Sequence, residues 1–165
     1  MMTTRTAARN RRENELALPA LERERNMKRD WDLLRKQLTD IESGHDVLTD
    51  IPAAPKWTDD LTWEAYDQIA KEHRSLEERL AGHLELLIDS GYVDGLQVLR
   101  GADGHFSYGR SAPRLTMAGH DLLDTMRSGT IWESIKQTAK TKGIELTFDA
   151  IKALAGYALK HSLGT

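Results

Sequence analysis

The chain has 165 residues, of which 39% are hydrophobic and 30% are charged, and it contains no cysteine. This length and apolar share suit one domain of ordinary size, and the lack of cysteine excludes disulfides, thiolate metal sites and cysteine nucleophiles. No apolar run approaches the roughly 20 residues that cross a bilayer, and the N-terminus lacks the apolar segment of a signal peptide. We therefore expect a cytoplasmic protein without membrane contact.

The charge is distributed unevenly along the chain. Residues 1–26 contain six arginines and four glutamates, whereas residues 27–165 contain 17 basic and 22 acidic residues. Residues 1–26 also have few large apolar side chains, so we predict a basic tail there, disordered or a helical run-in, followed by one folded domain over residues 27–165. The tail arginines that could contact phosphate are Arg5, Arg9, Arg11 and Arg12.

The domain opens with a predicted helix in MKRDWDLLRKQLTDIES. Its apolar residues recur at helical spacing on one side, and Gly44 ends it. These apolar residues are Trp31, Leu34, Leu38 and Ile41. The next stretch, HDVLTDIPAAPKWTDD, contains two prolines and several turn formers. It is predicted to be a loop, with a short strand at residues 47–51 as the alternative within it.

Two helices separated by a turn are predicted next. LTWEAYDQIAKEH has Thr62 as its N-cap and places Trp63, Tyr66, Ile69 and Ala70 on one side. The second helix begins at Ser75, which forms a capping box with Glu78.

The helix that begins at Ser75 has a leucine stripe and stops at Gly91. The stripe consists of Leu76, Leu80, Leu84, Leu87 and Ile88. Because the stripe is expected to be buried, we predict that the opposite face, with Arg79, Gly82 and His83, points outward.

After Gly91 the apolar period changes from helical to two. YVDGLQVLR and HFSYG alternate around the turn GADG, which predicts a β-hairpin. Three helices are predicted to close the chain, in TMAGHDLLDTMR, TIWESIKQTAKTK and TFDAIKALAGYALKHSL. Thr130 with Glu133 is a second capping box, and Thr147 is the expected cap of the last helix.

This order of elements is typical of a winged helix-turn-helix. We predict a mainly α fold with one small β-hairpin wing and a C-terminal helical extension. Four blocks, MKRDWDLLRKQL, LAGHLELLIDSGYVDG, RLTMAGHDLLDTMRSGTIWESIK and LTFDAIKALAGYAL, also resemble a bacterial and phage-associated family, domain of unknown function number 2513. The resemblance covers about residue 27 to the C-terminus and implies a small, winged-helix-like protein of prophages and mobile elements, without an established activity.

The first functional hypothesis is a DNA-binding regulator that contacts double-stranded DNA. Base edges and phosphates are read mainly by basic and amide side chains, and the capped helix and the hairpin offer several of them. The candidates are Lys71, Arg74, Ser75, Arg79, His83, Arg100, His105, Arg110 and Arg114. We expect Arg79 and His83 to face the groove, and Arg100, Arg110 and Arg114 to face phosphates.

The alternative hypothesis is a protein-interaction module, for example one encoded by a phage that inhibits or modulates a host defence protein. The acidic balance of residues 27–165 favours this alternative. The last helix is apolar around most of its circumference, so it is either packed within the monomer or shared with another chain, in a homodimer or with a partner protein.

Nothing in the sequence predicts catalysis, a metal site or a cofactor. The six histidines form no pair at metal-binding spacing, GLQVLRGADG lacks the Lys-Ser/Thr of a phosphate loop, and no GxSxG elbow occurs. We therefore expect a protein that is not an enzyme.

Overall fold

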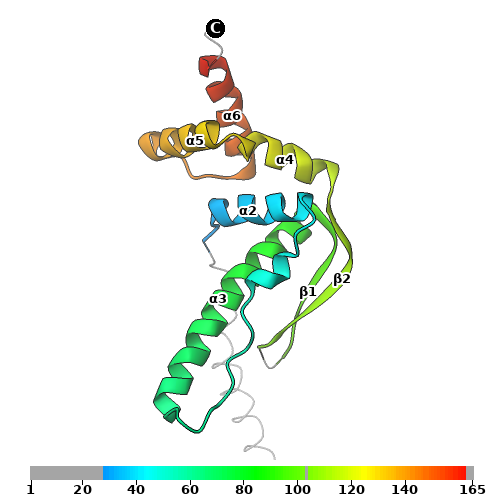
Figure 1. Ribbon diagram of the computed structural model, residues 1–165. Coiled ribbons are helices and arrows are strands. Elements are labelled where there is room, and N and C mark those ends of the chain that lie inside the picture. The colour runs from blue at the N-terminus through cyan, green and yellow to red at the C-terminus, as the bar shows by residue number, and fades with distance from the viewer. Residues whose placement is uncertain (1–27, 103, 163–165) are drawn as a thin grey trace, which may run out of the picture.

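The computed structural model describes residues 28–102 and 104–162. Figure 1 shows α2 crossing one end of the long helix α3, with the hairpin beside both helices and α4, α5 and α6 on the far side of α2. The elements are α2 (Trp31–Glu42), the 3-10 helix η1 (Val47–Asp50), α3 (Trp63–Asp89), β1 (Val93–Arg100), β2 (Phe106–Leu115), α4 (Met117–Arg127), α5 (Gly129–Lys142) and α6 (Phe148–Ser162).

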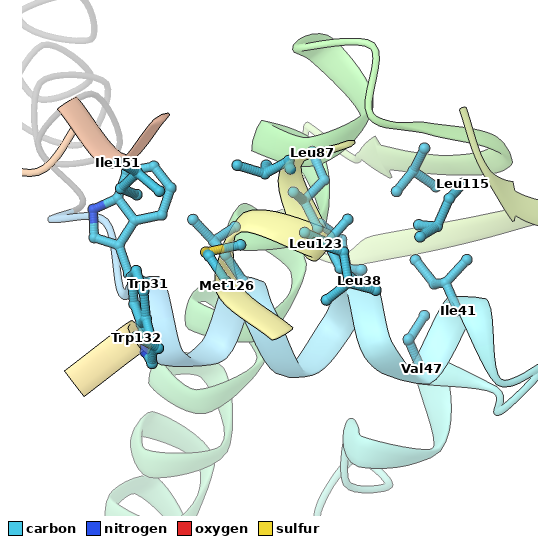
Figure 2. Close-up of a cluster of buried hydrophobic side chains, with 14 of the residues drawn as sticks. Trp31, Leu38, Ile41, Val47, Leu87, Leu115, Leu123, Met126, Trp132 and Ile151 are labelled. Carbon is cyan, nitrogen blue, oxygen red and sulfur yellow. The ribbon is translucent and has the colours of Figure 1, made fainter. Parts of the chain in front are cut away.

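α2 lies at the centre of the hydrophobic core. Its N-cap is Asp30, whose carboxylate accepts a hydrogen bond from the Leu33 amide at 3.1 Å. The apolar side that the sequence predicted is buried as expected. Figure 2 shows Leu38 and Ile41 of α2 among residues of α3, β2 and the C-terminal helices. The central helix therefore holds together segments that are far apart in the sequence.

The segment that follows α2 is not a strand. Residues Val47–Asp50 form η1, and the Asp46 carboxylate caps it by accepting from the Leu48 amide at 3.1 Å. The alternative of a short strand at residues 47–51 is therefore wrong. An aspartate that bonds the amide two residues ahead favours a turn over an extended strand.

The two helices expected between residues 61 and 90 form one continuous helix. α3 runs from Trp63 to Asp89 with Thr62 as its N-cap, and Ser75 lies in its interior. The predicted turn before Ser75 is therefore wrong. Lys-Glu-His-Arg before Ser75 contains no glycine or proline, and a break there would leave backbone amides and carbonyls without partners. A capping-box sequence can begin a helix only where the residues before it are not already helical.

The predicted β-hairpin is confirmed and is longer than expected. β1 and β2 pair antiparallel, with Val93 opposite Leu115 and Arg100 opposite Phe106. The register shifts at Gly95, where φ is +74° and an added Cβ would lie 2.3 Å from the Ser111 carbonyl oxygen. Glycine is therefore required at this bulge.

Three helices close the chain, as the sequence predicts, and they lie on one side of α2 (Figure 1). Ser128 caps α5 by accepting from the Ile131 amide, so the expected cap at Thr130 is wrong, because the helix starts one residue before that threonine. The Thr147 hydroxyl accepts from the Ala150 amide at 3.1 Å, which confirms the expected cap of α6. α6 buries Ile151 and Ala155 against the core.

The fold class is therefore confirmed at the level of its elements. The molecule is mainly helical, with a small two-stranded antiparallel hairpin and helices at the C-terminal end. The helix-turn-helix within it is replaced by a single long helix, whose first half reaches beyond the core.

Candidate functional site

His83, in the C-terminal third of α3, joins this helix to the start of α2. The Asp30 amide donates to His83 Nε2 at 2.8 Å, and Nδ1 lies 2.7 Å from the Arg79 carbonyl oxygen. An amide can only donate and a carbonyl can only accept, so the proton of this imidazole lies on Nδ1. His83 is 1% exposed, and burial lowers its pKa below the ordinary value of 6.5. The expected outward placement of Gly82 and His83 is therefore wrong, because both are buried.

Arg79 is exposed, as predicted, but it is engaged beside His83. Its guanidinium donates to the Asp30 carboxylate, and this hydrogen bond holds the pKa of Asp30 below its usual range. The residues expected to face a DNA groove therefore form a contact between two helices. The charge of Arg79 is therefore partly neutralised by Asp30.

Most of the other basic candidates also pair with carboxylates of the chain. Arg100 makes a bidentate contact with Glu85, with its shortest N–O distance at 2.6 Å. The remaining pairs are Arg110 with Asp46, Arg114 with Asp94 at 2.7 Å, and Lys71 with Asp67 at 2.6 Å. Exposed pairs of this kind stabilise the fold little, but they neutralise the local charge that attracts DNA.

Three further candidates lie on the surface. Arg74 and Ser75 are exposed on α3, and His105 is exposed beside the hairpin turn. The tail candidates Arg5, Arg9, Arg11 and Arg12, and the boundary between the tail and the domain, lie outside the described residues. Among the described candidates, the structure therefore brings Arg79 and His83 together and pairs Lys71, Arg100, Arg110 and Arg114 with carboxylates.

A groove of about 1560 Å³ lies between α3, the start of α2 and the segment joining α5 to α6. Six basic and six acidic residues line it, together with Trp31 and Phe148. Some of these lining residues form ion pairs with one another. The pairs are Arg79–Asp30, Arg100–Glu85 and Lys136–Asp32. Its charge is balanced, so it is not a phosphate channel.

The N-terminal half of α3 projects from the rest of the molecule. None of residues 63–79 is buried, whereas residues 80–84 are all buried. Residues 51–62 run alongside this half, with His73 Nε2 2.8 Å from the Pro52 carbonyl oxygen. We call residues 51–79 the arm. Tyr108 of β2 braces its base by donating to Glu77 at 3.0 Å, and burial raises the pKa of Tyr108.

Three aromatic rings cluster at the end of the arm. Trp57, Trp63 and Tyr66 have ring centroids between 5.4 and 6.2 Å apart. Trp57 is 48% exposed and Trp63 is 66% exposed. We call these three residues the aromatic tip. A cluster of exposed large aromatic side chains is typical of a binding surface. Tryptophan and tyrosine are also among the residues that contribute most to binding energy at protein interfaces.

The leucine stripe of α3 continues from the core onto the arm. Leu80, Leu84 and Leu87 are buried, but Ile69 and Leu76 on the same side are 42% and 40% exposed. From Ile69 to Leu87 the spacings are seven, four, four and three residues, which keep these side chains in line along the helix. The arm thus presents an apolar row that leads from its tip to the core.

The surroundings of this apolar row are acidic. The arm contains seven acidic and four basic residues. Two of its basic residues, Lys71 and Arg79, already pair with Asp67 and Asp30. The remaining carboxylates form no ion pair with another described residue. The arm therefore offers apolar contacts within a negative field.

The structure shows neither a metal site nor a membrane-spanning helix in the part of the chain it describes. No group of three or more His, Asp or Glu residues in this part is arranged to hold a metal ion. None of its helices combines the length and the apolar character needed to span a bilayer. The predictions that the protein binds no cofactor and is not an enzyme stay predictions.

The fold and these surfaces define a small, mainly helical protein with a β-hairpin and a projecting aromatic arm. Residues 28–145 match the family described as hypothetical protein (DUF2513), and the chain belongs to this family. A protein of Haemophilus influenzae described as uncharacterized is 31% identical over 137 residues, which are 83% of this chain and 99% of that protein. No solved structure matches the chain.

No local motif in the sequence marks the arm as a site. Trp63, Tyr66 and Ile69 were expected on one side of a short helix, and Trp57 was expected only within a loop. One feature of the sequence does indicate a single long helix: between Thr62 and Gly91 there is no proline, and Gly82 is the sole glycine. A helix of this length, about 40 Å, is longer than a core of this size can cover.

Proposed function

We propose that this protein is a protein-interaction module that docks on its partner through the arm. The observation that carries the proposal is the aromatic tip, in which Trp57 and Trp63 stay largely in water although they contact one another. Rigid aromatic side chains supply a large contact area at a low entropic cost, which makes them effective anchors in an interface.

The side-chain contacts favour this proposal over DNA binding. Arg100, Arg110 and Arg114 are each paired with a carboxylate, and His83 is buried. The arm itself has an excess of acid. A phosphate backbone would be repelled by the surface that presents the apolar row.

The chemistry of the arm defines the partner class. An acidic, apolar surface complements a protein surface that is basic at its rim and apolar at its centre. A host protein inhibited or modulated by a phage-type protein fits this class, and the phage association implied by the family resemblance stays a prediction. The proposal assigns the chain no catalytic step.

The test compares affinity purification of the wild-type protein and of the double variant Trp57→Ala/Trp63→Ala. We expect the tagged wild type to retain a protein in stoichiometric amount without nucleic acid, either another protein or an untagged second copy of this chain. The double variant is expected to lose at least about 90% of it, since tip residues of this kind each contribute on the order of 2 kcal/mol. The matched control is Leu99→Ala, which removes an exposed apolar side chain from the hairpin.

Two results would contradict the proposal. One is equal retention of the partner by the double variant when its circular dichroism is unchanged. The other is specific binding of duplex DNA that weakens steeply with salt, which would restore the DNA hypothesis. Fluorescence anisotropy with labelled duplexes at increasing salt measures the second result.

A further inference from the structure

Unpaired charges of opposite sign gather at opposite ends of the molecule. The arm carries Asp59, Asp60, Glu64 and Glu72, none of which forms an ion pair with another described residue, against Lys56 and Arg74. Residues 140–160 carry Lys140, Lys142, Lys152 and Lys160, which likewise lack such pairs, against two acidic residues. Figure 1 places the free end of α3 and the free end of α6 at the two extremes of the molecule.

The basic end also has an apolar surface. α6 buries Ile151 and Ala155, while Tyr157 and Leu159 are about half exposed. Gly156 lies on the exposed side, and an added Cβ there would meet no atom within 4 Å. The exposed side of α6 therefore has Gly156 near its centre, Lys152 and Lys160 on either side of the glycine, and Leu159 and Tyr157 at its edges. A second helix could approach it closely.

We infer that a second copy of this chain occupies the arm. In the dimer two molecules lie antiparallel, and the arm of each packs on α6 of the other. This inference rests on the proposed function, because it names the partner of the same surface. Trp63, Ile69 and Leu76 meet Tyr157 and Leu159 of the second copy, and the arm carboxylates face the lysines of α6.

Twofold symmetry explains why both ends carry complementary surfaces. An antiparallel dimer makes the contact between arm and α6 twice, so it closes and leaves neither surface free. Two contacts are needed, because one pair of short helix faces is small beside the 1,200–2,000 Å² that stable interfaces typically bury. Pairing arm with arm or α6 with α6 would instead place like charges together.

The first measurement is the mass in solution. The chain has a mass of 18.6 kDa, and light scattering after gel filtration is expected to give about twice this value at concentrations near 100 μM. Two charge-reversed variants are then compared with it: Asp60→Lys/Glu72→Lys on the arm and Lys152→Glu/Lys160→Glu on α6. Each variant alone is expected to weaken self-association by at least about tenfold. Circular dichroism checks that both are folded.

The decisive measurement mixes the two variants in equal amounts. In a mixed antiparallel dimer one contact pairs the reversed arm with the reversed α6, and the other pairs the two unchanged surfaces. Both contacts are then attractive, so the mixture is expected to recover a dissociation constant within about threefold of the wild type. Should either reversal disturb folding, the milder pair Asp60→Asn/Glu72→Gln and Lys152→Gln/Lys160→Gln tests the same contact, with single-variant weakening as the readout.

Three outcomes overturn the inference: a monomer at every concentration, a dimer unaffected by either reversal, or mixing without recovery. A dimer that only the α6 variant weakens indicates packing of α6 on α6. A monomeric protein whose Trp57→Ala/Trp63→Ala variant loses a captured partner refutes the dimer and leaves the proposed function standing. If the wild type is monomeric and captures nothing through its arm, both fail.

Discussion

At the scale of single residues, His83 is buried and hydrogen-bonded through both ring nitrogens. It accepts from the Asp30 amide, donates to the Arg79 carbonyl and is surrounded by the Arg79–Asp30 pair. A protonated imidazole has no lone pair on Nε2, so protonation would break the bond to the amide that begins α2. Burial opposes the same charge and lowers the pKa of His83.

The free energy of unfolding is therefore expected to depend on pH through His83. Unfolded His83 binds a proton as the pH falls below about 6.5, whereas folded His83 does so only at lower pH. The unfolded state then binds more protons, so the contribution is complete above pH 6.5 and is lost as the pH falls toward the folded pKa. Urea unfolding between pH 5 and pH 7.5 measures this slope.

The variant His83→Gln separates this residue from the others. The glutamine oxygen can accept from the Asp30 amide without titrating, so the slope between pH 5 and pH 6.5 is expected to become shallower. The pKa values of Asp30 and Asp32 are lowered by partners that include Arg79 and Trp132, and these carboxylates act only at more acidic pH. An unchanged slope in His83→Gln would show that His83 does not titrate as we argue.

His83→Ala should cost about 2 kcal/mol, because it leaves the buried amide without a partner.

Among the elements, α3 departs furthest from its local sequence signals. Ser75 and Glu78 have the spacing of a capping box, yet the helix passes through them without interruption. Starting a helix is costly and extending one is not, so a capping signal within a helix-compatible sequence is overridden. The real N-cap is Thr62, whose hydroxyl accepts from the Ala65 amide at 3.3 Å.

Two alanine variants distinguish one helix from two. At an N-cap, Ser75→Ala would cost about 1 kcal/mol, but inside a helix it is expected to be neutral or to stabilise by up to about 0.5 kcal/mol. Thr62→Ala is the matched control and should lose about 1 kcal/mol of helix stability. Denaturant unfolding, with helicity followed by circular dichroism, measures both. A larger loss in Ser75→Ala than in Thr62→Ala would mean that α3 is broken at Ser75.

At the scale of the whole molecule, stability is distributed unevenly. The core is built around α2 and includes Leu84 and Leu87 of α3, whereas the arm has no buried residue in its helical half. Apolar burial is the main source of stability, so the arm depends on helix propensity, its cap and the adjoining loop. An extended helix of this kind keeps its aromatic tip at a distance from the core.

Amide hydrogen exchange is expected to show this gradient. In dilute protein, amides of residues 66–76 should exchange at least about tenfold faster than those of residues 80–88, because they open without disturbing the core. Raising the concentration should slow exchange in residues 66–76 and in α6 together if the two surfaces meet in a dimer. Uniform protection along α3 in dilute protein would contradict the projecting arm.

The sequence by itself determined the helices around the core, the hairpin and the stop signals. Trp31, Leu34 and Leu38 have helical spacing, the strands alternate with period two, and Gly143 ends α5 in the left-handed conformation. These features depend on neighbours within a few residues, so they can be predicted locally.

Only the tertiary structure decided which sides of α3 are buried. His83 faces inward because the start of α2, 53 residues earlier, lies against it, and Trp63 faces water because nothing in the core reaches so far along the helix. The same stripe is core at Leu84 and surface at Ile69. An apolar row in a sequence indicates that a helix has one preferred side, but how much of that row is covered depends on the reach of elements that are distant in the chain.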